Sequence, residues 1–224
     1  FRSDADKLIE QGKVLVNGQV AGMGQQVEET DTVQVGKKIL QGKQTQKVLA
    51  FYKPVGVTCT ERDPHAEKKI MDMIRYPERL TYAGRLDKDS EGLILLTNDG
   101  DLINAMMRGA NRHEKEYIVK TDREITPDFL EKMAKGIYLK DLDITTRECK
   151  IEQIGKFTFR IVLTQGVNRQ IRRMCEACGY RVKALKRIRI MNILLGDLKP
   201  GKWREVTGEE LEQLQRDTGM LNRN

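Results

Sequence analysis

Residues 83–100 read AGRLDKDSEGLILLTNDG, and this stretch decides the fold that the sequence predicts. Glycine and serine in residues 84–92 indicate a loop, residues 93–96 are apolar enough for a strand, and residues 98–100 are typical of a turn before a helix. The stretch thus predicts a polar loop, a strand and a helix in direct succession.

Outside this stretch, strand-like and helical runs alternate irregularly. The runs with strand character are residues 48–52, 117–120, 157–163, 180–190 and 190–195. Those with helical periodicity are residues 68–74, 101–107, 127–134, 168–178 and 209–216. Such mixing predicts an α+β fold with a mixed, mainly antiparallel sheet and flanking helices, and not a doubly wound parallel sheet.

The beginning of the chain predicts a separate small module. Residues 4–11 have the pattern of an amphipathic helix, and residues 13–17 and 32–35 alternate as strands do. Residues 36–47 are polar and rich in lysine, which is typical of a linker. We therefore expect two domains, residues 1–42 and residues 46–218.

Composition restricts the class of protein. No stretch approaches the roughly 18 apolar residues that a membrane span requires, and residues 1–4 do not open a signal peptide. Four cysteines in 224 residues are too few for a secreted disulfide scaffold. We expect a cytoplasmic monomer that does not contact a membrane.

Positive charge is concentrated in one part of the chain. The formal net charge is +7, and residues 150–204 alone carry 14 basic and 3 acidic residues. A local excess of this size is the footprint of a surface that binds polyanions, because each neutralised phosphate releases counterions. Nucleic acid is the first partner that this predicts, and an ordinary soluble basic surface is the alternative.

Residues 168–178, NRQIRRMCEAC, have two distinct helix faces. At 100° per residue the apolar side chains share one stripe, and the arginines lie opposite or beside it. The stripe consists of Ile171, Met174, Cys175 and Cys178. The cysteines match a CxxC, but no second pair and no histidine has the spacing of a zinc site, so we expect core packing rather than zinc or redox chemistry. The basic groups of this helix and of the next strand-like run are Arg169, Arg172, Arg173, Arg181, Lys183, Lys186, Arg187 and Arg189.

Three carboxylates lie within five residues, namely Asp87, Asp89 and Glu91. Their order does not fit an EF-hand, so a solvated acidic loop is the default interpretation. Arg85 lies two residues from Asp87 and hence on the same side of an extended backbone. Lys115 precedes Tyr117 in a strand-like run, where a tyrosine is most often half-buried packing. Lys53 leads into a turn at residues 54–56.

Together these segments resemble the pseudouridine synthases of the RsuA/RluB/RluE/RluF family over nearly the whole chain. The motifs that carry the resemblance are Arg85-Leu86-Asp87, Gly92-Leu93, residues 96–100 (LTNDG), Lys115-Glu116-Tyr117, residues 168–174 (NRQIRRM), Gly201-x-Trp203-Arg204 and Lys53-Pro54-x-Gly56. Residues 189–192 (RIMN) are most similar to the RluF branch. Residues 2–18 resemble the second half of an S4 RNA-binding domain that lacks its first helix, and the zero net charge of residues 1–44 agrees with a weakened RNA footprint.

The resemblance implies the pseudouridine synthase fold, preceded by a truncated S4-like module, and a role for each matched residue. Asp87 is implied to be the catalytic aspartate, Tyr117 the ring that stacks on the target uracil, and Arg172 the cation paired with Asp87. Ile171 is implied to be an apolar wall of the pocket, and Arg85 to fill the gap left by the flipped nucleotide. The other cations expected to bind RNA are Lys53, Lys115, Arg169, Arg173, Arg181 and Lys183.

The chemistry of such an enzyme agrees with these residue types. Isomerising uridine means breaking the bond from C1′ to N1, rotating the base and rejoining through C5, which cannot occur inside a base stack. An aromatic platform favours the flipped base by about 1–3 kcal/mol, and a neighbouring arginine keeps an aspartate ionised. Asp87 then acts either as a nucleophile at C1′ or as the base that takes the 2′ proton, and both routes stay open. No step requires a metal or another cofactor, and we expect neither.

We therefore expect an RNA pseudouridine synthase that acts on a specific uridine in structured RNA, and the resemblance implies large-subunit (23S) ribosomal RNA. A tRNA anticodon uridine is the alternative substrate. The alternative function is a non-catalytic RNA-binding or ribosome-assembly protein, which has no reason to keep a carboxylate in a basic cleft because it repels phosphate. A deaminase, which also flips bases, does not fit because its zinc motif is absent from the sequence.

Overall fold

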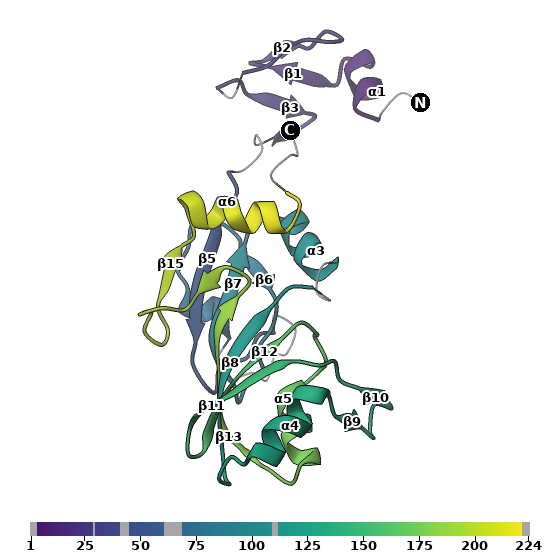
Figure 1. The fold of residues 1–224 in the computed structure, drawn as a ribbon. Helices are drawn as coiled ribbons and strands as arrows, with labels where there is room; N and C mark the ends of the chain where they lie inside the picture. The colour runs from purple at the N-terminus through teal and green to yellow at the C-terminus, as the bar shows by residue number, and fades with distance from the viewer. Residues whose placement is uncertain (1–3, 29, 41–44, 61–68, 109–111, 221–224) are drawn as a thin grey trace. The chain divides into compact units, whose positions relative to one another are not determined.

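The structure is a computed structural model, and it describes all residues except 1–3, 29, 41–44, 61–68, 109–111 and 221–224. The chain forms two compact units, Phe1–Thr45 and Gln46–Asn224 (Figure 1). Among the described residues, no helix combines the length and the apolar character that crossing a bilayer requires.

The first unit is a short helix packed on a four-stranded antiparallel sheet with the strand order β2-β1-β3-β4. Its elements are α1 (Asp4–Glu10), β1 (Val14–Val16), β2 (Gln19–Val20), β3 (Val33–Val35) and β4 (Lys38–Leu40). Asn17 and Gly18 both have positive φ and form the two-residue turn between β1 and β2, a typical hairpin signal. A small core of Val14, Val16 and Ala21 closes against α1.

Strand β4 lies in the segment that was predicted to be a linker. Val35 pairs with Lys38, so Gly36 and Lys37 form a two-residue turn, and Gly36 has φ +61 as hairpin turns favour. All three residues of β4 are exposed. A strand of three exposed residues has no alternation of buried and exposed positions, which is the pattern by which half-buried strands are recognised in a sequence.

The second unit is built on a nine-stranded sheet whose main path runs β11-β12-β8-β13-β7-β5-β15. Its strands are β5 (Val48–Lys53), β6 (Thr81–Ala83), β7 (Glu91–Thr97), β8 (Lys115–Thr121), β11 (Lys150–Gly155), β12 (Thr158–Leu163), β13 (Val182–Ile190), β14 (Ile193–Leu194) and β15 (Trp203–Glu205). Strands β9 (Tyr138–Leu139) and β10 (Ile144–Thr145) form a separate pair. β7 and β13 run parallel, and the other neighbouring strands pair antiparallel. This confirms the predicted α+β fold with a mixed, mainly antiparallel sheet.

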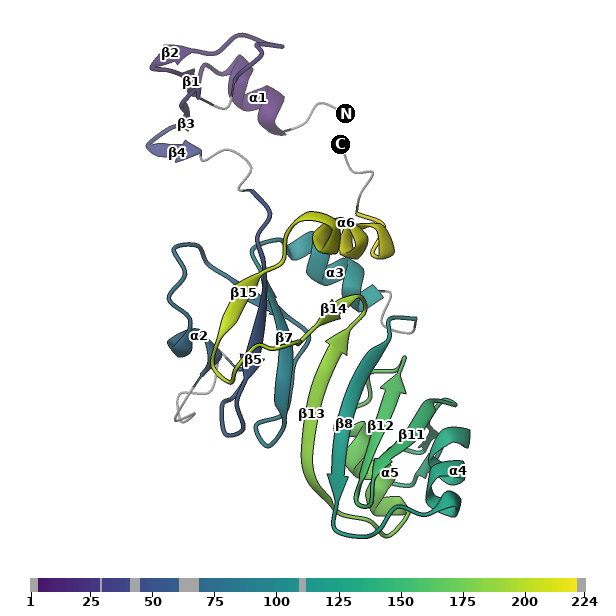
Figure 2. The same ribbon diagram turned by 60° about the vertical axis from the view of Figure 1, so that its left-hand side comes forward.

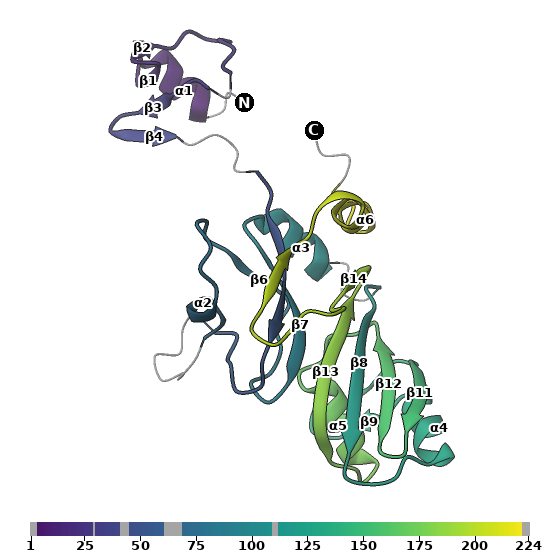
Figure 3. The same ribbon diagram turned by 90° about the vertical axis from the view of Figure 1, so that its left-hand side faces the viewer.

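In the part of the chain that the structure describes, five helices flank this sheet, each in a region that was predicted to be helical. They are α2 (Ile70–Met73), α3 (Gly100–Arg108), α4 (Pro127–Lys135), α5 (Gln170–Ala177) and α6 (Gly208–Asp217). α3 and α6 lie beside the half of the sheet that contains β5 and β7, and α4 and α5 beside the half that contains β8, β11 and β12 (Figures 2 and 3). The core agrees with this division, because Leu102 and Leu214 pack with β5 and β7, and Phe129 and Met174 pack with β8 and β12.

Strands β5 and β7 are buried on both faces. Phe51 and Ile94 belong to the hydrophobic cluster on one side, and Ala50 and Leu95 belong to the cluster on the other side. Strands covered on both faces are continuously apolar rather than alternating, which explains the run of residues 93–96. This rigid strand carries the acidic loop at its beginning.

Candidate active site

A pocket of about 390 Å³ opens where the loop before β7, strand β8, strand β13 and the start of α5 come together. Several segments far apart in the sequence therefore contribute to its wall. Seven residues predicted to form the site line this pocket, namely Arg85, Asp87, Lys115, Tyr117, Arg169, Ile171 and Arg172. Leu163 and Leu185 add apolar surface.

Asp87 lies in a tight turn between β6 and β7. The backbone N–H of Ser90 donates to the carbonyl oxygen of Asp87 over 3.1 Å, which closes the turn. The backbone N–H of Gly56 donates to the carbonyl oxygen of Lys88 over 2.7 Å. The side chain of Asp87 is 35% exposed. The backbone of the turn is thus fixed while its carboxylate stays accessible.

Arg169 and Arg172 hold this turn from the start of α5. The two terminal nitrogens of Arg169 donate to the two carboxylate oxygens of Asp89 at 3.0 and 2.9 Å. Nη2 of Arg172 donates to the carbonyl oxygen of Asp89 at 3.0 Å and to Oγ of Ser90 at 3.1 Å. The hydrogen bond from Arg169, with the charge of Arg172 nearby, holds the pKa of the Asp89 carboxyl below its usual value.

The pairing of Asp87 differs from the one that the resemblance implied. Nη1 of Arg169 lies 3.5 Å from Oδ2 of Asp87, whereas Nη1 of Arg172 lies 3.4 Å from Oδ2 of Asp89. The turn brings Asp89 to the N-terminus of α5, where both arginines reach it. Arg169 is the N-cap residue of α5 and has φ +53. Such left-handed backbone costs about 1–3 kcal/mol in a residue other than glycine, and strain of this kind is concentrated at functional sites.

Lys53 was expected to bind RNA, but the structure buries it. Its side chain is 0% exposed, and Nζ donates to the carbonyl oxygens of Pro54 and Val57 at 2.7 Å each and of Lys88 at 3.4 Å. Burial lowers the pKa of this ammonium group. Lys53 therefore anchors the Asp87 turn to the end of β5 instead of reaching the pocket.

Arg187 lines the pocket although it was expected only among the basic groups of the surface. It is 2% exposed, and Nε donates to the carbonyl oxygen of Leu93 at 2.8 Å while Nη1 donates to that of Arg85 at 3.3 Å. Arg187 thus ties β13 to both sides of the Asp87 turn. This close approach of β13 explains the glycine at position 92, because an added Cβ there would lie 2.2 Å from the carbonyl oxygen of Arg187.

Besides Lys53, three other predicted RNA-binding cations lie outside the pocket. Nε of Arg173 donates to the carbonyl oxygen of Asn168 at 2.9 Å, and its Nη1 lies 3.9 Å from Asp141. Arg181 and Lys183 are exposed at the start of β13. Their contact with RNA stays a prediction for the outer surface.

The apolar stripe of α5 packs into the core. Ile171, Met174 and Cys175 are buried, and Cys178 is half-buried against the same cluster. Burial raises the pKa of the Cys175 thiol to about 12. The core-packing interpretation of the CxxC pair is therefore confirmed.

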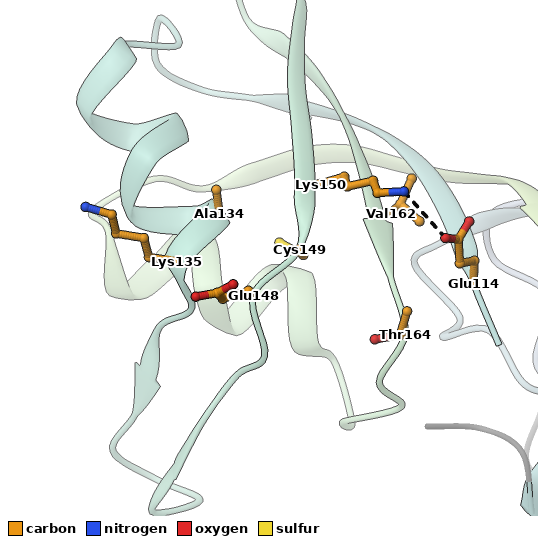
Figure 4. Close-up of a pocket in the computed structure, with 8 residues that line it drawn as sticks. All are labelled: Glu114, Ala134, Lys135, Glu148, Cys149, Lys150, Val162 and Thr164. Atoms are coloured by element: carbon orange, nitrogen blue, oxygen red, sulfur yellow. Dashed lines mark ion pairs between the residues drawn. The ribbon is translucent and has the colours of Figure 1, made fainter. Parts of the chain in front are cut away.

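A second cavity, of about 460 Å³, lies beside α4, β11 and β12 (Figure 4). It is lined by Glu114, Ala134, Lys135, Glu148, Cys149, Lys150, Val162 and Thr164. Lys150 pairs with Glu114 there at 3.7 Å. The predicted site residues do not line this cavity.

The first pocket combines an accessible carboxylate, an aromatic ring, apolar walls and several arginines. Tyr117 offers a flat surface for a heterocycle, Ile171 and Leu185 enclose it, and Asp87 lies in the same lining. A pocket of this kind can hold a planar ligand and present a carboxylate to it.

Comparison with known proteins shows the family to which the chain belongs. The sequence profile of the RNA pseudouridylate synthase family matches residues 47–177, and that of the S4 domain matches residues 2–33. The chain is 45% identical over 215 residues to the dual-specificity RNA pseudouridine synthase RluF of Escherichia coli, covering 95% of this chain and 73% of that protein. It is 33% identical over 226 residues to the ribosomal large subunit pseudouridine synthase B of Vibrio cholerae, covering 95% of this chain and 70% of that protein. A crystal structure of a pseudouridylate synthase has a TM-score of 0.71 at 29% identity, covering 96% of this chain and 94% of that one. The chain therefore belongs to the RNA pseudouridine synthase family, with an S4 domain in its N-terminal unit, and is an enzyme that isomerises uridine in RNA.

Proposed function

We propose that Asp87 is the catalytic residue of this enzyme and that Tyr117 is the platform for the flipped uracil. The observation that carries the proposal is the presence of both side chains in one pocket, with the Asp87 turn fixed by Arg169, Arg172 and Lys53. A turn held from several sides keeps a reacting carboxylate in place without reorganisation during the reaction.

The residues of the pocket supply each part of the reaction. Tyr117 stacks on the extruded base and Ile171 packs against it. Arg85 is exposed at the pocket and is long enough to occupy the place that the nucleotide leaves in the RNA. Asp87 either bonds to C1′ or takes the 2′ proton, and in both routes the electron pair of the C1′–N1 bond goes to N1. After the base rotates, C5 bonds to C1′ while the Asp87–C1′ bond breaks or, in the other route, while Asp87 returns the proton to C2′. The C5 proton then leaves and N1 takes up a proton.

The proposed substrate is a uridine in large-subunit ribosomal RNA, with a tRNA anticodon uridine as the second candidate. Support comes from the names of two relatives, one called a ribosomal large subunit enzyme and the other called dual-specificity. The basic segment of residues 150–204 provides affinity for phosphate in either RNA. We also propose that the enzyme acts as a monomer in the cytoplasm, where its four free thiols stay reduced.

The test is tritium release from RNA labelled at C5 of uridine, in the presence of EDTA. We expect release by the wild type and none by Asp87→Asn, with RNA affinity retained because the variant removes a negative charge from a basic cleft. Asp101→Asn is the matched control, since Asp101 is an exposed carboxylate on α3 outside the pocket. Turnover by Asp87→Asn would show that another group carries the reaction. Ribosomal RNA and tRNA tested separately decide between the two substrates.

A further inference from the structure

Two cations line the pocket without a part in the mechanism above. Lys115 is the first residue of β8, and Arg187 lies opposite Tyr117 on β13. Lys115 and Tyr117 are two residues apart on one strand, so they share a face of the sheet. All three side chains line the same pocket. A bulge in β13 between Arg187 and Arg189 sends the following arginine to a different set of partners.

Among the described residues, no carboxylate pairs with either cation. Within the described part of the chain, Lys115 has no ion pair or hydrogen bond for its ammonium group, and Nη2 of Arg187 is buried without a partner. The acidic neighbours along β8 are engaged elsewhere: Arg189 lies 3.0 Å from Glu114 and 3.7 Å from Glu116. The pocket therefore keeps the ammonium group of Lys115 available, with the buried guanidinium group of Arg187 near it.

Keeping these charges in the pocket is unfavourable in the free enzyme. Burial, with the charge of Arg187 nearby, lowers the pKa of Lys115 to about 8. Arg187 is held rigidly because Leu93 and Arg85 accept two of its hydrogen bonds. A fixed pair of like charges, partly removed from water, is an arrangement that favours a negatively charged partner. The carboxylate of Asp87, in the same pocket lining, lies 3.5 Å from Nη1 of Arg169 instead.

The proposed reaction creates such a negative charge in this pocket. When the C1′–N1 bond breaks, its electron pair goes to N1, and the charge spreads over N1, O2 and O4 of the uracil ring. Asp87 bonds to C1′ or takes the 2′ proton in the same step. When C5 later bonds to C1′, the ring uses this electron pair, and Asp87 leaves C1′ or returns the proton to C2′. The C5 proton is then released to solvent, and N1 takes up a proton.

We infer that Lys115 is a further catalytic residue, which contacts the departing uracil and stabilises its negative charge, and that Arg187 behind it is a positioning residue. The inference rests on the proposed function of the pocket. A phosphate of the target nucleotide is the other anion that two cations suit. The two anions differ in timing, because phosphate is charged in the ground state whereas the uracil ring gains its charge only as the bond breaks.

The variant Lys115→Met tests the inference, because it distinguishes an effect on the rate of the reaction from an effect on the affinity for RNA. We expect single-turnover tritium release to fall by about 10²–10³-fold, as for the loss of one preorganised donor to a developing anion. RNA affinity should stay within about threefold of the wild type. Lys120→Met is the matched control, because Lys120 is an exposed lysine on the same strand outside the pocket. A normal rate, or a loss of affinity with a normal rate, would overturn the inference, and the second result would identify phosphate as the ligand.

Lys115→Arg provides a second measurement that does not depend on the folding of the methionine variant. Arginine stays charged at high pH, so the rate of the wild type should fall above about pH 8 relative to that of Lys115→Arg. Ionisation of the uracil ring itself affects both proteins equally. Arg187 is the charged neighbour of Lys115 that affects its pKa, and the other charged groups of the pocket lining are Arg85, Asp87, Arg169 and Arg172; all are unchanged in the variant. Superimposable pH profiles would overturn the inference.

The outcome of these experiments separates the inference from the proposed function. An active wild type, an inactive Asp87→Asn and a fully active Lys115→Met would remove the role of Lys115 alone. Tritium release by Asp87→Asn at the wild-type rate would overturn both proposals.

Discussion

Replacing Gly92 with alanine tests whether the contact between β7 and β13 sets the geometry of the pocket. Gly92 has φ +115, and an added Cβ would lie 2.2 Å from the carbonyl oxygen and 2.7 Å from the nitrogen of Arg187. Heavy atoms at a real Cβ stay beyond about 3.0 Å, so the strands must separate by roughly 1 Å. Because Arg187 binds the carbonyl oxygens of Leu93 and Arg85, this shift reaches the Asp87 turn.

The size of the effect follows from two terms. Strained backbone at an alanine costs about 1–3 kcal/mol, and overpacking costs about 1–3 kcal/mol more. We therefore expect the free energy of unfolding of Gly92→Ala to fall by about 2–6 kcal/mol. A displacement of about 1 Å at a reacting group lowers the rate by about 100-fold. Urea unfolding followed by circular dichroism measures the first quantity, and single-turnover tritium release at saturating enzyme measures the second.

Gly196→Ala separates backbone strain from the steric contact. Gly196 has φ +57, but an added Cβ there meets nothing within 4 Å. We expect this variant to lose about 1 kcal/mol of stability, from backbone strain alone, and to keep the wild-type rate. If Gly92→Ala behaved like Gly196→Ala in both assays, the contact between β7 and β13 would not control the site.

Three further predictions concern the cations and the acidic turn. Replacing Arg181 and Lys183 together by alanine should weaken binding to RNA of every nucleotide sequence. Each lost phosphate contact should reduce the slope of log affinity against log salt concentration by about 0.9. An unchanged slope would mean that this end of β13 does not face RNA. Lys53→Met leaves the carbonyl oxygens of Pro54 and Val57 without their donor. The free energy of unfolding, measured by thermal unfolding, should therefore fall by about 1–3 kcal/mol. An unchanged midpoint temperature would contradict this. The hydrogen bond from Arg169 lowers the pKa of Asp89 from its usual value of 3.8. As pH falls, Asp89 is therefore protonated in the unfolded chain before it is protonated in the folded one. The stability that Asp89 contributes is complete above about pH 4 and is lost as pH falls through the folded pKa. The unfolding midpoint of the wild type should therefore fall more steeply with acidification than that of Asp89→Asn, and parallel curves would refute this assignment.

Helix α5 shows how much of the site a sequence predicts. The stripe of Ile171, Met174 and Cys175 has helical spacing, and the structure buries all three side chains. Arg169 and Arg172, on the remaining faces, reach the pocket as expected. Periodicity within one element is local information, so it needs no knowledge of the neighbouring strands.

Lys53 and Arg187 show what stays out of reach. Nζ of Lys53 binds the carbonyl oxygen of a residue 35 positions away, and Nε of Arg187 binds one 94 positions away. Whether a cation is buried depends on such acceptors, which the sequence does not place. Strands β11 and β4 are hard to predict for a similar reason. Their side chains are largely exposed, so their pairing depends on tertiary contacts rather than on a hydrophobic pattern in the sequence.

The parallel contact between β7 and β13 also bears on the order of folding. It consists of two register pairs, Lys186 with Glu91 and Arg187 with Gly92, and it joins residues 95 positions apart. Contacts between such distant residues require a large loop to close and form slowly. Each half of the sheet has its own hydrophobic cluster and hairpins, so we expect the halves to form first and to join last. The Asp87 turn and Tyr117 belong to different halves, and the appearance of activity during refolding would therefore report the final step of assembly.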